Sequence, residues 1–443
     1  MPESLTIDKA SPSPGQACSV AVIGMGYVGL PTALGLHAGG VRVVGIDRDA
    51  GRLKAIETQA VDLIDSDHRQ LANSLGQEGF ELTTDAARMA DADVVIVCVP
   101  TPVDRHLLPD LGPLQGACDE VVSHARRGQT LILTSTSFVG TTTRMLVEPL
   151  IDRGFTIGTD IYVASSPERI DPGNVTHTQR DTPRVIGGVT PECAAKATRV
   201  IELLASVTHQ VGSPEVAEMT KLYENTFRAV NIALANEFAD ICAGFSLDPI
   251  EVIDAARTKP YGFMAFHPGP GVGGHCIPCD PHYLLWQLRE TRTTAPLVHQ
   301  AMNAIAERPR GVVDRMQSVL SDAGKGFGGS NILIVGVSYK PGVLDVRSSS
   351  ALEIIDYLAG RGAKVEYYDP LVTRMTLPSG AGMDSTVEPA AQDWDLVLIH
   401  TVQPGHDYSW IADCPLVLDA TYRFDPTSAG TPAGTSPAEG RPV

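Results

Sequence analysis

The sequence predicts an α/β protein in which two sheet-containing domains flank a helical one, and three observations support this fold class. Short β-branched runs alternate with helix-forming stretches from about residue 19 to residue 205, a long helix-forming stretch follows, and strand-like runs resume at residue 331. Alternating strands and helices are typical of a parallel sheet with crossover helices. The chain has 443 residues, of which 43% are hydrophobic, so it can bury more than one core.

Apolar patterns predict the elements of each part in turn. The first sheet is predicted from five runs, SVAVIG, VRVVGID, DVVIVCVP, TLILTST and IYVASSP. From Pro214 to about Ala256 apolar residues recur at three- and four-residue intervals, which predicts a long central helix and a helical domain. The second sheet is predicted from NILIVGVSY, KVEYYD, DLVLIH and LVLDA.

The two α/β halves resemble each other. DADVVIVCVPTP at 91–102 is echoed by DWDLVLIHTVQP at 393–404, and VRVVGID is echoed by KVEYYD, each strand ending in an aspartate. A duplicated dinucleotide-type fold explains the echo. Both chain ends are rich in Pro, Gly, Ser and Thr and lack apolar periodicity, so we expect them to be disordered. The predicted bounds are a disordered start over 1–17, α/β domains over 18–210 and 323–425, a helical dimerisation domain over 211–322 and a disordered tail over 426–443.

Charge and cysteine usage exclude several function classes. A formal net charge of -18 repels phosphate backbones and anionic lipid, so we expect neither a nucleic acid nor a membrane partner. The sequence has no apolar segment long enough to span a membrane and no secretion signal at its start, which favours a cytoplasmic protein. Its eight scattered cysteines do not form a disulfide framework, and reduced thiols are expected.

A glycine pattern predicts a dinucleotide site. Gly24, Gly26 and Gly29 form G-x-G-x-x-G between an apolar strand and a helix-like stretch. These glycines allow a tight turn, close approach to a pyrophosphate and close helix packing. Asp47, at the end of the second strand, is placed to accept hydrogen bonds from ribose hydroxyls, which favours NAD. Arg48 and Arg52 leave NADP open as an alternative, because either can accommodate its extra phosphate.

The segment FHPGPGVGGHCIPCDPHYL predicts a reactive centre. Its glycines and prolines suit a backbone that approaches a ligand closely, and Cys276 is the candidate nucleophile for thiohemiacetal and thioester chemistry on an aldehyde. Cys276 and Cys279 also form a C-x-x-C pair, for which redox or zinc roles are alternatives. No second such pair completes a zinc set, and we expect the two cysteines to lie in a loop and not to open a helix.

Lys221 and Asn225 are four residues apart, which places them on one face of the predicted central helix. A desolvated Lys221 can act as a base or as a partner of a developing oxyanion. By spacing alone, however, a solvated surface lysine is the more common interpretation.

Seven ordered motifs together resemble the UDP-glucose/GDP-mannose dehydrogenase family. They are GMGYVGLP, CVPTP, TSTSFVGTT, SPERIDPG, KLYENTFRAVNIALANE, PGPGVGGHCIPCDP and GVSYKPGVLDVRSSSALEI, and they span roughly residues 18 to 425. The resemblance implies two Rossmann-like domains joined by a helical domain whose long central helix forms a homodimer. It also implies NAD in the first domain and a nucleotide diphosphate in the last. No metal is expected, because no zinc ligand set is complete.

The motifs and the resemblance together assign site residues. The catalytic residues are Cys276, Lys221, Asp280, Glu168, Asn225 and Thr136. The cofactor-binding residues are Gly24, Gly26, Tyr27, Val28, Gly29, Asp47, Arg52, Thr101, Thr136 and Arg347. The substrate-binding residues are Glu168, Arg169, Lys221, Asn225, Lys259, Tyr261, Gly273 and Lys340. By resemblance, Glu168 serves thioester hydrolysis, Asp280 helps to orient water and base, and Lys221 and Asn225 hold the reacting oxygen.

The implied function is NAD-dependent oxidation of the C6 alcohol of a UDP-sugar to the uronate, as used in polysaccharide biosynthesis. The run TKPYGFMAFHPGPGVGGHCIP resembles the branch acting on UDP-N-acetylhexosamines, so UDP-N-acetylglucosamine is the first expectation, with UDP-glucose or UDP-N-acetylmannosamine as alternatives. Cys279, Ser348 and the run DATYRF depart from the family pattern and leave pocket details open. Other hypotheses are a two-electron hydroxyacid dehydrogenase and a nucleotide-sugar-binding regulator without turnover.

Overall fold

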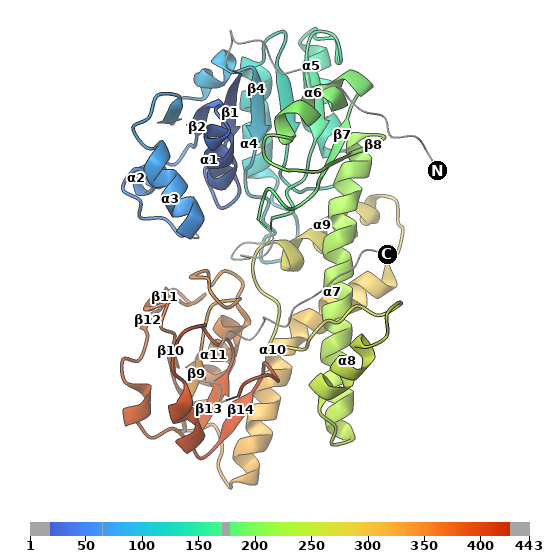
Figure 1. Cartoon of the computed structure of the whole chain (residues 1–443). Helices are drawn as coiled ribbons and strands as arrows, with labels where there is room; N and C mark the ends of the chain where they lie inside the picture. The colour runs from blue at the N-terminus through green and yellow to red at the C-terminus, as the bar shows by residue number, and fades with distance from the viewer. Residues whose placement is uncertain (1–17, 64, 171–177, 426–443) are drawn as a thin grey trace. The chain divides into compact units, whose positions relative to one another are not determined.

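The computed structural model describes residues 18–63, 65–170 and 178–425. It divides the chain into two compact units, whose elements are labelled in Figure 1. The first unit holds the chain up to Thr101 and from Asp110 to Lys221, and the second holds Pro102–Pro109 and the chain from Leu222 onward. The predicted C-terminal α/β domain and the predicted helical domain from Leu222 onward therefore both fall in the second unit. The predicted disordered start and tail lie outside the described residues.

The first unit contains an eight-stranded sheet in the order β3-β2-β1-β4-β5-β6-β7-β8. Its strands are β1 (Ser19–Ile23), β2 (Arg42–Ile46), β3 (Phe80–Thr83), β4 (Val94–Val97), β5 (Thr130–Leu133), β6 (Tyr162–Ser165), β7 (Arg184–Gly188) and β8 (Thr208–Val211). The five predicted runs all form strands. Neighbouring strands are parallel, as expected, except that β7 runs antiparallel to β6.

Helices cover this sheet and bury its central strands on both faces. They are α1 (Gly29–Ala38), α2 (Ala50–Glu57), α3 (Asp65–Ser74), α4 (Gly112–His124), α5 (Glu148–Asp152) and α6 (Pro191–Ile201), with the short helices η1 (Ala86–Asp91) and η2 (Thr143–Val147). All four residues of β4 are buried, as are all four of β5. On one face, apolar residues of α1 and α6 pack against Val20, Val22 and Ile96 in one core cluster. Burial on both faces explains the continuous apolar runs.

The predicted central helix is α7 (Pro214–Gly244), which begins in the first unit and continues into the second. The helix-forming stretch does not continue unbroken to Ala256. Ser246 has a positive φ of 58° and ends the run, and Asp248 then caps α8 (Pro249–Arg257) by accepting a hydrogen bond from the Ile250 N–H at 2.8 Å. Pro249 at the first position of α8 needs no intrahelical N–H partner.

The second unit adds α9 (Cys276–Glu290), α10 (Pro296–Asp322) and a four-stranded parallel sheet in the order β10-β9-β13-β14. Its remaining elements are β9 (Asn331–Val335), α11 (Ser350–Gly360), β10 (Lys364–Tyr368), β11 (Arg374–Thr376), β12 (Gly382–Asp384), η3 (Pro389–Ala391), β13 (Leu396–Ile399), η4 (Ser409–Asp413) and β14 (Val417–Asp419). This order repeats β2-β1-β4-β5 of the first unit, as a duplicated dinucleotide-type fold predicts.

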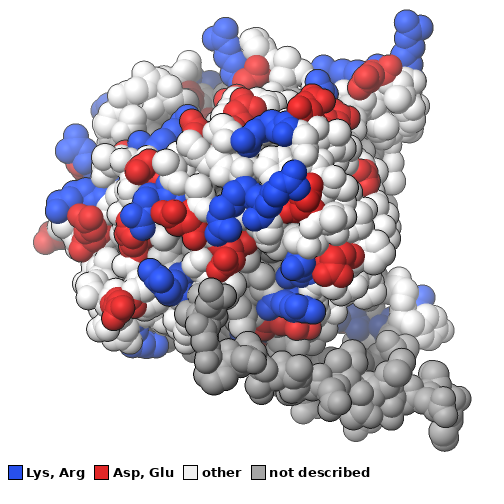
Figure 2. Space-filling view, turned by 90° about the horizontal axis from the view of Figure 1, so that it is seen from above, with Lys and Arg blue, Asp and Glu red and all other residues white. Residues whose placement is uncertain are grey.

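Two surface properties bear on possible partners. On the face seen in Figure 2, acidic and basic side chains are interspersed. Within the described parts of the chain, no helix combines the length and apolar character that a membrane span requires.

Candidate active site

The glycine turn of the first unit follows β1 directly. Gly24 has φ of +87°, and a Cβ there would lie 2.7 Å from the Cys98 carbonyl oxygen. A Cβ on Gly29 would lie 1.8 Å from the Gly24 carbonyl oxygen, whereas one on Gly26 would meet nothing within 4 Å. Packing therefore requires the outer two glycines, and the backbone at Gly26 stays open to a ligand. The N-terminus of α1 follows at once and favours an anion.

Asp47 and Arg52 complete this turn. The Asp47 carboxylate accepts hydrogen bonds from the N–H groups of Met25 at 2.7 Å and of Asp49 at 3.0 Å, one on each oxygen. With no other partner among the described residues, each oxygen keeps a lone pair with which it can accept a ribose hydroxyl. Arg52 donates through Nε to the Met25 carbonyl at 2.8 Å, and this hydrogen bond stabilises the turn. Tyr27 is 39% exposed, while Val28 packs on the core.

The residues after β4 and β5 lie at the same edge of the sheet, because the carboxyl ends of parallel strands meet there. Thr101 is buried and Thr136 is half-buried. The Thr134 hydroxyl donates to the Val97 carbonyl at 2.7 Å, and the Ser135 hydroxyl donates to the Val99 carbonyl at 2.8 Å. These bonds tie the two loops together.

Glu168 lies just beyond β6 and is buried with Arg184, a partner that sequence reasoning missed. Its carboxylate accepts hydrogen bonds from the N–H groups of Arg169 at 2.8 Å and Ile170 at 3.0 Å, and from Arg184 Nη1 at 2.5 and 2.6 Å. Burial raises the pKa of Glu168, but the charge and hydrogen bonds of Arg184 and the two backbone bonds outweigh it and hold that pKa below its usual value. Glu168 is therefore a carboxylate at neutral pH.

The start of α7 is fixed by another buried carboxylate. Glu218 accepts hydrogen bonds from the Gly140 N–H at 2.6 Å, the Thr142 N–H at 2.8 Å and the Thr142 hydroxyl at 2.7 Å. One turn further along α7, Lys221 is buried, 9% exposed, and is not a solvated surface residue. Burial of this kind fits a functional lysine and contradicts the surface interpretation.

Asn225 and Asp280 are brought together in the second unit. Asn225 Nδ2 donates to Asp280 Oδ2 at 2.5 Å, and both side chains are buried, 3% and 2% exposed. The bond joins α7 to the first turns of α9, across a sequence separation that spacing could not bridge. The amide thus orients the acid predicted to act on water and base.

The prediction that Cys276 and Cys279 lie in a loop is wrong. Cys276 is the first residue of α9, and Cys279 lies one turn later. The run Ile277-Pro278 does not prevent a helix, since a first-turn proline lacks only an N–H that has no partner inside the helix. The Cys276 thiol is exposed at this N-terminus, where the helix dipole stabilises a thiolate.

Cys279 has the opposite environment. It is buried, and burial together with nearby Asp280 raises its pKa to about 12, although a backbone hydrogen bond from Val103 opposes the shift. A second ionisable thiol, as a dithiol redox pair needs, is thus missing at neutral pH. The described residues also contain no group of three or more His, Cys, Asp or Glu side chains placed to hold a metal.

The glycine-rich segment before Cys276 packs against protein. A Cβ on Gly271 would lie 2.4 Å from the Ser350 Cβ, and one on Gly273 would lie 2.6 Å from the Tyr339 Cβ. Gly274, with φ of +81°, donates its N–H to the Arg347 carbonyl at 3.1 Å. Close packing on the C-terminal α/β part therefore accounts for these glycines without a ligand.

The remaining predicted residues lie in separate places of the second unit. Arg347 donates to Asp345 through Nε at 2.9 Å and through Nη2 at 2.6 Å. Lys259 Nζ lies 5.2 Å from the centroid of the exposed Tyr261 ring. Lys340 follows the turn after β9 and is half-buried.

The departures from the family pattern have local structural roles. Ser348 adopts a positive φ of 51°, and Tyr422, in DATYRF, has φ of 62°. The Tyr422 hydroxyl accepts hydrogen bonds from Arg308 at 2.7 Å and Arg315 at 2.5 Å, which joins the end of β14 to α10.

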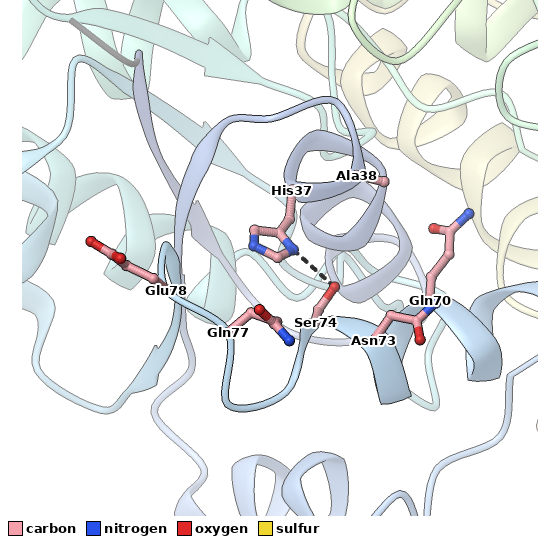
Figure 3. Close-up of a pocket in the computed structure, with 7 residues that line it drawn as sticks. All are labelled: His37, Ala38, Gln70, Asn73, Ser74, Gln77 and Glu78. Atoms are coloured by element: carbon pink, nitrogen blue, oxygen red, sulfur yellow. Dashed lines mark hydrogen bonds between the residues drawn. The ribbon is translucent and has the colours of Figure 1, made fainter.

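One hollow of the first unit lies away from the glycine turn. Figure 3 shows its polar lining, in which the His37 ring and the Ser74 hydroxyl lie 2.9 Å apart. The lining residues are His37, Ala38, Gln70, Asn73, Ser74, Gln77 and Glu78. They come from the C-terminal end of α1 and from the end of α3 and the turn after it, whereas the glycine turn is at the N-terminus of α1. The hollow is therefore no part of the dinucleotide site.

Three family models match consecutive parts of the chain. The NAD binding domain of the UDP-glucose/GDP-mannose dehydrogenase family matches residues 18–205, its central domain matches 215–307, and its UDP binding domain matches 333–426. These matches cover most of the chain and lie in the order that the motifs predict.

Individual relatives are similar over most of their length. The UDP-N-acetyl-D-mannosamine dehydrogenase of Methanocaldococcus jannaschii is 34% identical over 86% of this chain and 84% of its own. The NDP-N-acetyl-D-galactosaminuronic acid dehydrogenase of Ralstonia solanacearum is 34% identical over 76% of this chain and 79% of its own. The solved structure of the UDP-D-ManNAc dehydrogenase of Pyrococcus horikoshii superposes with a TM-score of 0.84 at 30% identity, covering 93% of this chain and 97% of that one.

Proposed function

The chain belongs to the UDP-glucose/GDP-mannose dehydrogenase family and is an NAD-dependent oxidoreductase, and on that premise we propose that it oxidises the C6 alcohol of a UDP-N-acetylhexosamine to a carboxylate. The observation that carries the proposal is Cys276, an exposed thiol at a helix N-terminus in a chain matched by all three family domains. A nucleophilic cysteine is what a four-electron oxidation needs and a two-electron one does not.

The first unit fits NAD. The open backbone at Gly26, the N-terminus of α1 and the unused lone pairs of Asp47 match a pyrophosphate and a ribose. The negative charge of Asp47 disfavours an extra ribose phosphate, so the NADP alternative is the weaker one. When bound, NAD accepts one hydride in each oxidation.

The first oxidation converts the alcohol to an aldehyde. In our proposal the C6 hydroxyl loses its proton to a base that Asp280 helps to orient. Lys221 and Asn225 hold the oxygen. The buried Asn225–Asp280 hydrogen bond supports this role, because it fixes the acid that must orient water and base. Burial of Lys221 strengthens its interaction with a developing negative charge.

The second oxidation needs covalent chemistry. The Cys276 thiolate adds to the aldehyde carbon and forms a thiohemiacetal, whose carbon–hydrogen bond breaks with loss of hydride to give a thioester. Water then attacks the thioester carbon, its proton passes to Glu168, and the carbon–sulfur bond breaks to release the carboxylate and the thiolate. In total the alcohol and one water lose two hydrides and three protons.

We propose UDP-N-acetylmannosamine as the first substrate to test. The Methanocaldococcus jannaschii relative named for this sugar is matched over 84% of its own length, and the solved Pyrococcus horikoshii structure named for it superposes over 93% of this chain. This choice replaces UDP-N-acetylglucosamine, the first expectation from the loop motif, which becomes the second candidate. UDP-glucose follows it. Relatives named for a galactosaminuronate add UDP-N-acetylgalactosamine to the panel.

We also propose a homodimer through α7. Large apolar side chains of α7 are exposed in the second unit, and an uncovered apolar patch of this kind is typical of a protein interface. They are Tyr223, Phe227, Leu234, Phe238 and Ile241, which are 40% to 69% exposed. Light scattering is expected to give twice the 47.0 kDa of one chain.

A reduced, cytoplasmic setting fits cysteines that form no disulfide among the described residues.

The test is NADH formation at 340 nm with a panel of UDP-N-acetylmannosamine, UDP-N-acetylglucosamine, UDP-glucose, UDP-N-acetylgalactosamine and GDP-mannose. Two NADH per sugar consumed support the proposal and name the substrate. One NADH per molecule points to a two-electron alcohol oxidation, and none with any sugar points to a binding protein. The Cys276→Ala variant is expected to form no uronate. The matched control is Cys414→Ala, which removes the thiol at the C-cap of η4 and is expected to keep full activity.

A further inference from the structure

We propose that Arg184 is a positioning residue for thioester hydrolysis, which it serves by holding the Glu168 carboxylate so that only one of its oxygens faces the reaction. The inference rests on the proposed function, since it assumes that Glu168 receives the proton of the attacking water. It adds a residue that neither the motifs nor the family resemblance identified.

Sheet topology explains how Arg184 reaches this place. In the sheet of the first unit, β6 pairs with β7 in antiparallel register, with Ala164 opposite Gly188 and Ser165 opposite Gly187. Continuing that register by three residues places Glu168 opposite Arg184. Because β7 is reversed, its first residue, and not its last, arrives at the edge where the parallel strands end. A parallel β7 would have placed Arg184 at the far edge.

The hydrogen bonds divide the two oxygens of Glu168. Oε1 accepts from Arg184 Nη1 at 2.5 Å, from the Arg169 N–H at 2.8 Å and from the Ile170 N–H at 3.0 Å. Oε2 accepts from Arg184 Nη1 alone, at 2.6 Å, among the described residues. Oε1 is therefore saturated, and Oε2 retains the lone pair that can take a proton from water.

A purely stabilising role fits these contacts poorly. Arg184 is 1% exposed, yet within the described chain its Nε and Nη2 are buried without a hydrogen-bond partner. Buried ion pairs seldom stabilise a fold more than apolar residues of the same size do, and buried donors without partners weaken it. An arrangement that is unfavourable for folding and leaves one carboxylate oxygen able to accept a proton is better explained by chemistry at that oxygen.

The experiment follows the second half of the reaction in full-length Arg184→Met, Arg184→Lys and Glu168→Gln, with UDP-N-acetylmannosamine or the sugar that the panel identifies. Without its cation a buried carboxyl keeps its proton at neutral pH. Arg184→Met is therefore expected to release a burst of two NADH per active site and then slow about 100-fold or more, the usual worth of a general base. Intact-mass measurement is expected to show the acyl group on the protein.

The pH profile separates positioning from structure. Turnover of Arg184→Met is expected to recover as pH rises, because Glu168 then ionises, while Glu168→Gln, which has no carboxylate to recover, stays slow beyond hydroxide-driven hydrolysis. Arg184→Lys keeps a cation and is expected to hydrolyse faster than Arg184→Met. If Arg184→Met fails to fold, Arg184→Lys carries the test, because its displaced cation is expected to give a smaller shift of the pH profile in the same direction.

The controls separate the possible failures. Arg88→Met removes an exposed ion pair with Glu81 in the same unit and is expected to leave turnover unchanged. Wild-type hydrolysis in the Arg184 variants, or a loss that is equal at every pH and includes the first hydride, overturns the positioning role even if Glu168→Gln traps the acyl group. Normal hydrolysis by Glu168→Gln overturns both residue roles. A wild-type enzyme that forms no uronate overturns the proposed function itself.

Discussion

The two α/β halves share strand order and turn chemistry but differ at the aspartate that ends their second strand. Asp47 accepts two backbone hydrogen bonds and is half-buried. Asp369 is 1% exposed and accepts four, from the N–H groups of Val337, Ser338, Leu371 and Val372 at 2.9 to 3.4 Å. The same residue at the same topological position is thus open to a ligand in one half and enclosed in the other.

Gln403 helps to enclose Asp369 in the second half. It occupies the position equivalent to Thr101 in the sequence echo, and its Nε2 donates to the Ser338 hydroxyl at 2.8 Å and lies 3.3 and 3.4 Å from the Asp369 oxygens. The helix that follows also differs. α1 begins at Gly29, directly after its turn, whereas α11 begins only at Ser350, after a long loop. The two halves thus share a scaffold, but only the first leaves the strand-end aspartate open to a dinucleotide.

The largest loss of stability is expected for Asp369→Ala. Four backbone donors lose their acceptor in a buried place, and hydrogen bonds to a charged group are among the stronger ones, so we expect the free energy of unfolding to fall by about 4 kcal/mol. Denaturant unfolding of the purified variant measures it. The matched Asp47→Ala variant is expected to lose about 1 kcal/mol or less, because water can solvate the donors it frees. Equal losses would contradict the contrast between the two aspartates.

Acid is expected to destabilise the second half selectively. His400 occupies the position of Cys98 in the echo and is buried between Ser350 and Thr401. Burial lowers its pKa to about 4, although Asp369 opposes the shift. Between that value and the pKa of about 6.5 in the unfolded chain, only the unfolded chain binds the proton. The stability that depends on a neutral His400 is therefore fully present above about pH 6.5, and about 3 kcal/mol of it is lost by about pH 4.

The first half has Cys98 at the position equivalent to His400, so a cysteine substitution supplies the control for this acid effect. His400→Cys is expected to remove the His400 part of the pH dependence between pH 6.5 and 4, at some cost in packing at neutral pH. Thermal unfolding of both proteins at pH 7 and pH 4.5 makes the comparison. An unchanged difference between the two pH values would show that other groups dominate the acid sensitivity.

Cofactor affinity is expected to depend on Asp47 and not on Asp369's neighbours. In Asp47→Asn the amide keeps the shape but loses the charge that attracts ribose hydroxyl donors, so the Kd for NAD is expected to rise about 10- to 100-fold, equivalent to about 1.4 to 2.8 kcal/mol. Titration of NAD by calorimetry measures it. The Gln403→Ala variant, which alters the enclosed half, should leave that Kd within about twofold; a comparable weakening there would argue that the second half also contacts the dinucleotide.

The smallest effect on stability is expected for Gly26→Ala. A Cβ at this residue meets nothing within 4 Å, so the free energy of unfolding should change by about 0.5 kcal/mol or less. NAD binding should nonetheless weaken, because the methyl group occupies space that a pyrophosphate needs. Gly336→Ala is the contrast in the second half, since its Cβ would lie 1.7 Å from the Thr401 carbonyl oxygen, and it should unfold at a lower denaturant concentration.

Much of the fold followed from local patterns, and the misses have physical causes. The strands buried on both faces, such as β4 and β5, read as apolar runs. β8 (THQV) and β11 (RMT) are short and largely exposed, so they carry no such run. The Cys276 segment was expected to be a loop because its glycines and prolines are dense, but those glycines serve packing and the helix starts at the cysteine itself.

The sequence by itself determined the features whose cause is local. The glycine turn, the strand-end aspartates, the long helix from Pro214 and the reactive cysteine each depend on neighbouring residues, whose types restrict backbone conformation and chemistry directly. Only the tertiary structure decided which groups meet. The Glu168–Arg184 pair depends on one reversed strand, the Asn225–Asp280 bond joins two helices, and Gln403 encloses Asp369, because contacts between distant segments follow from strand register and packing, which no local pattern contains.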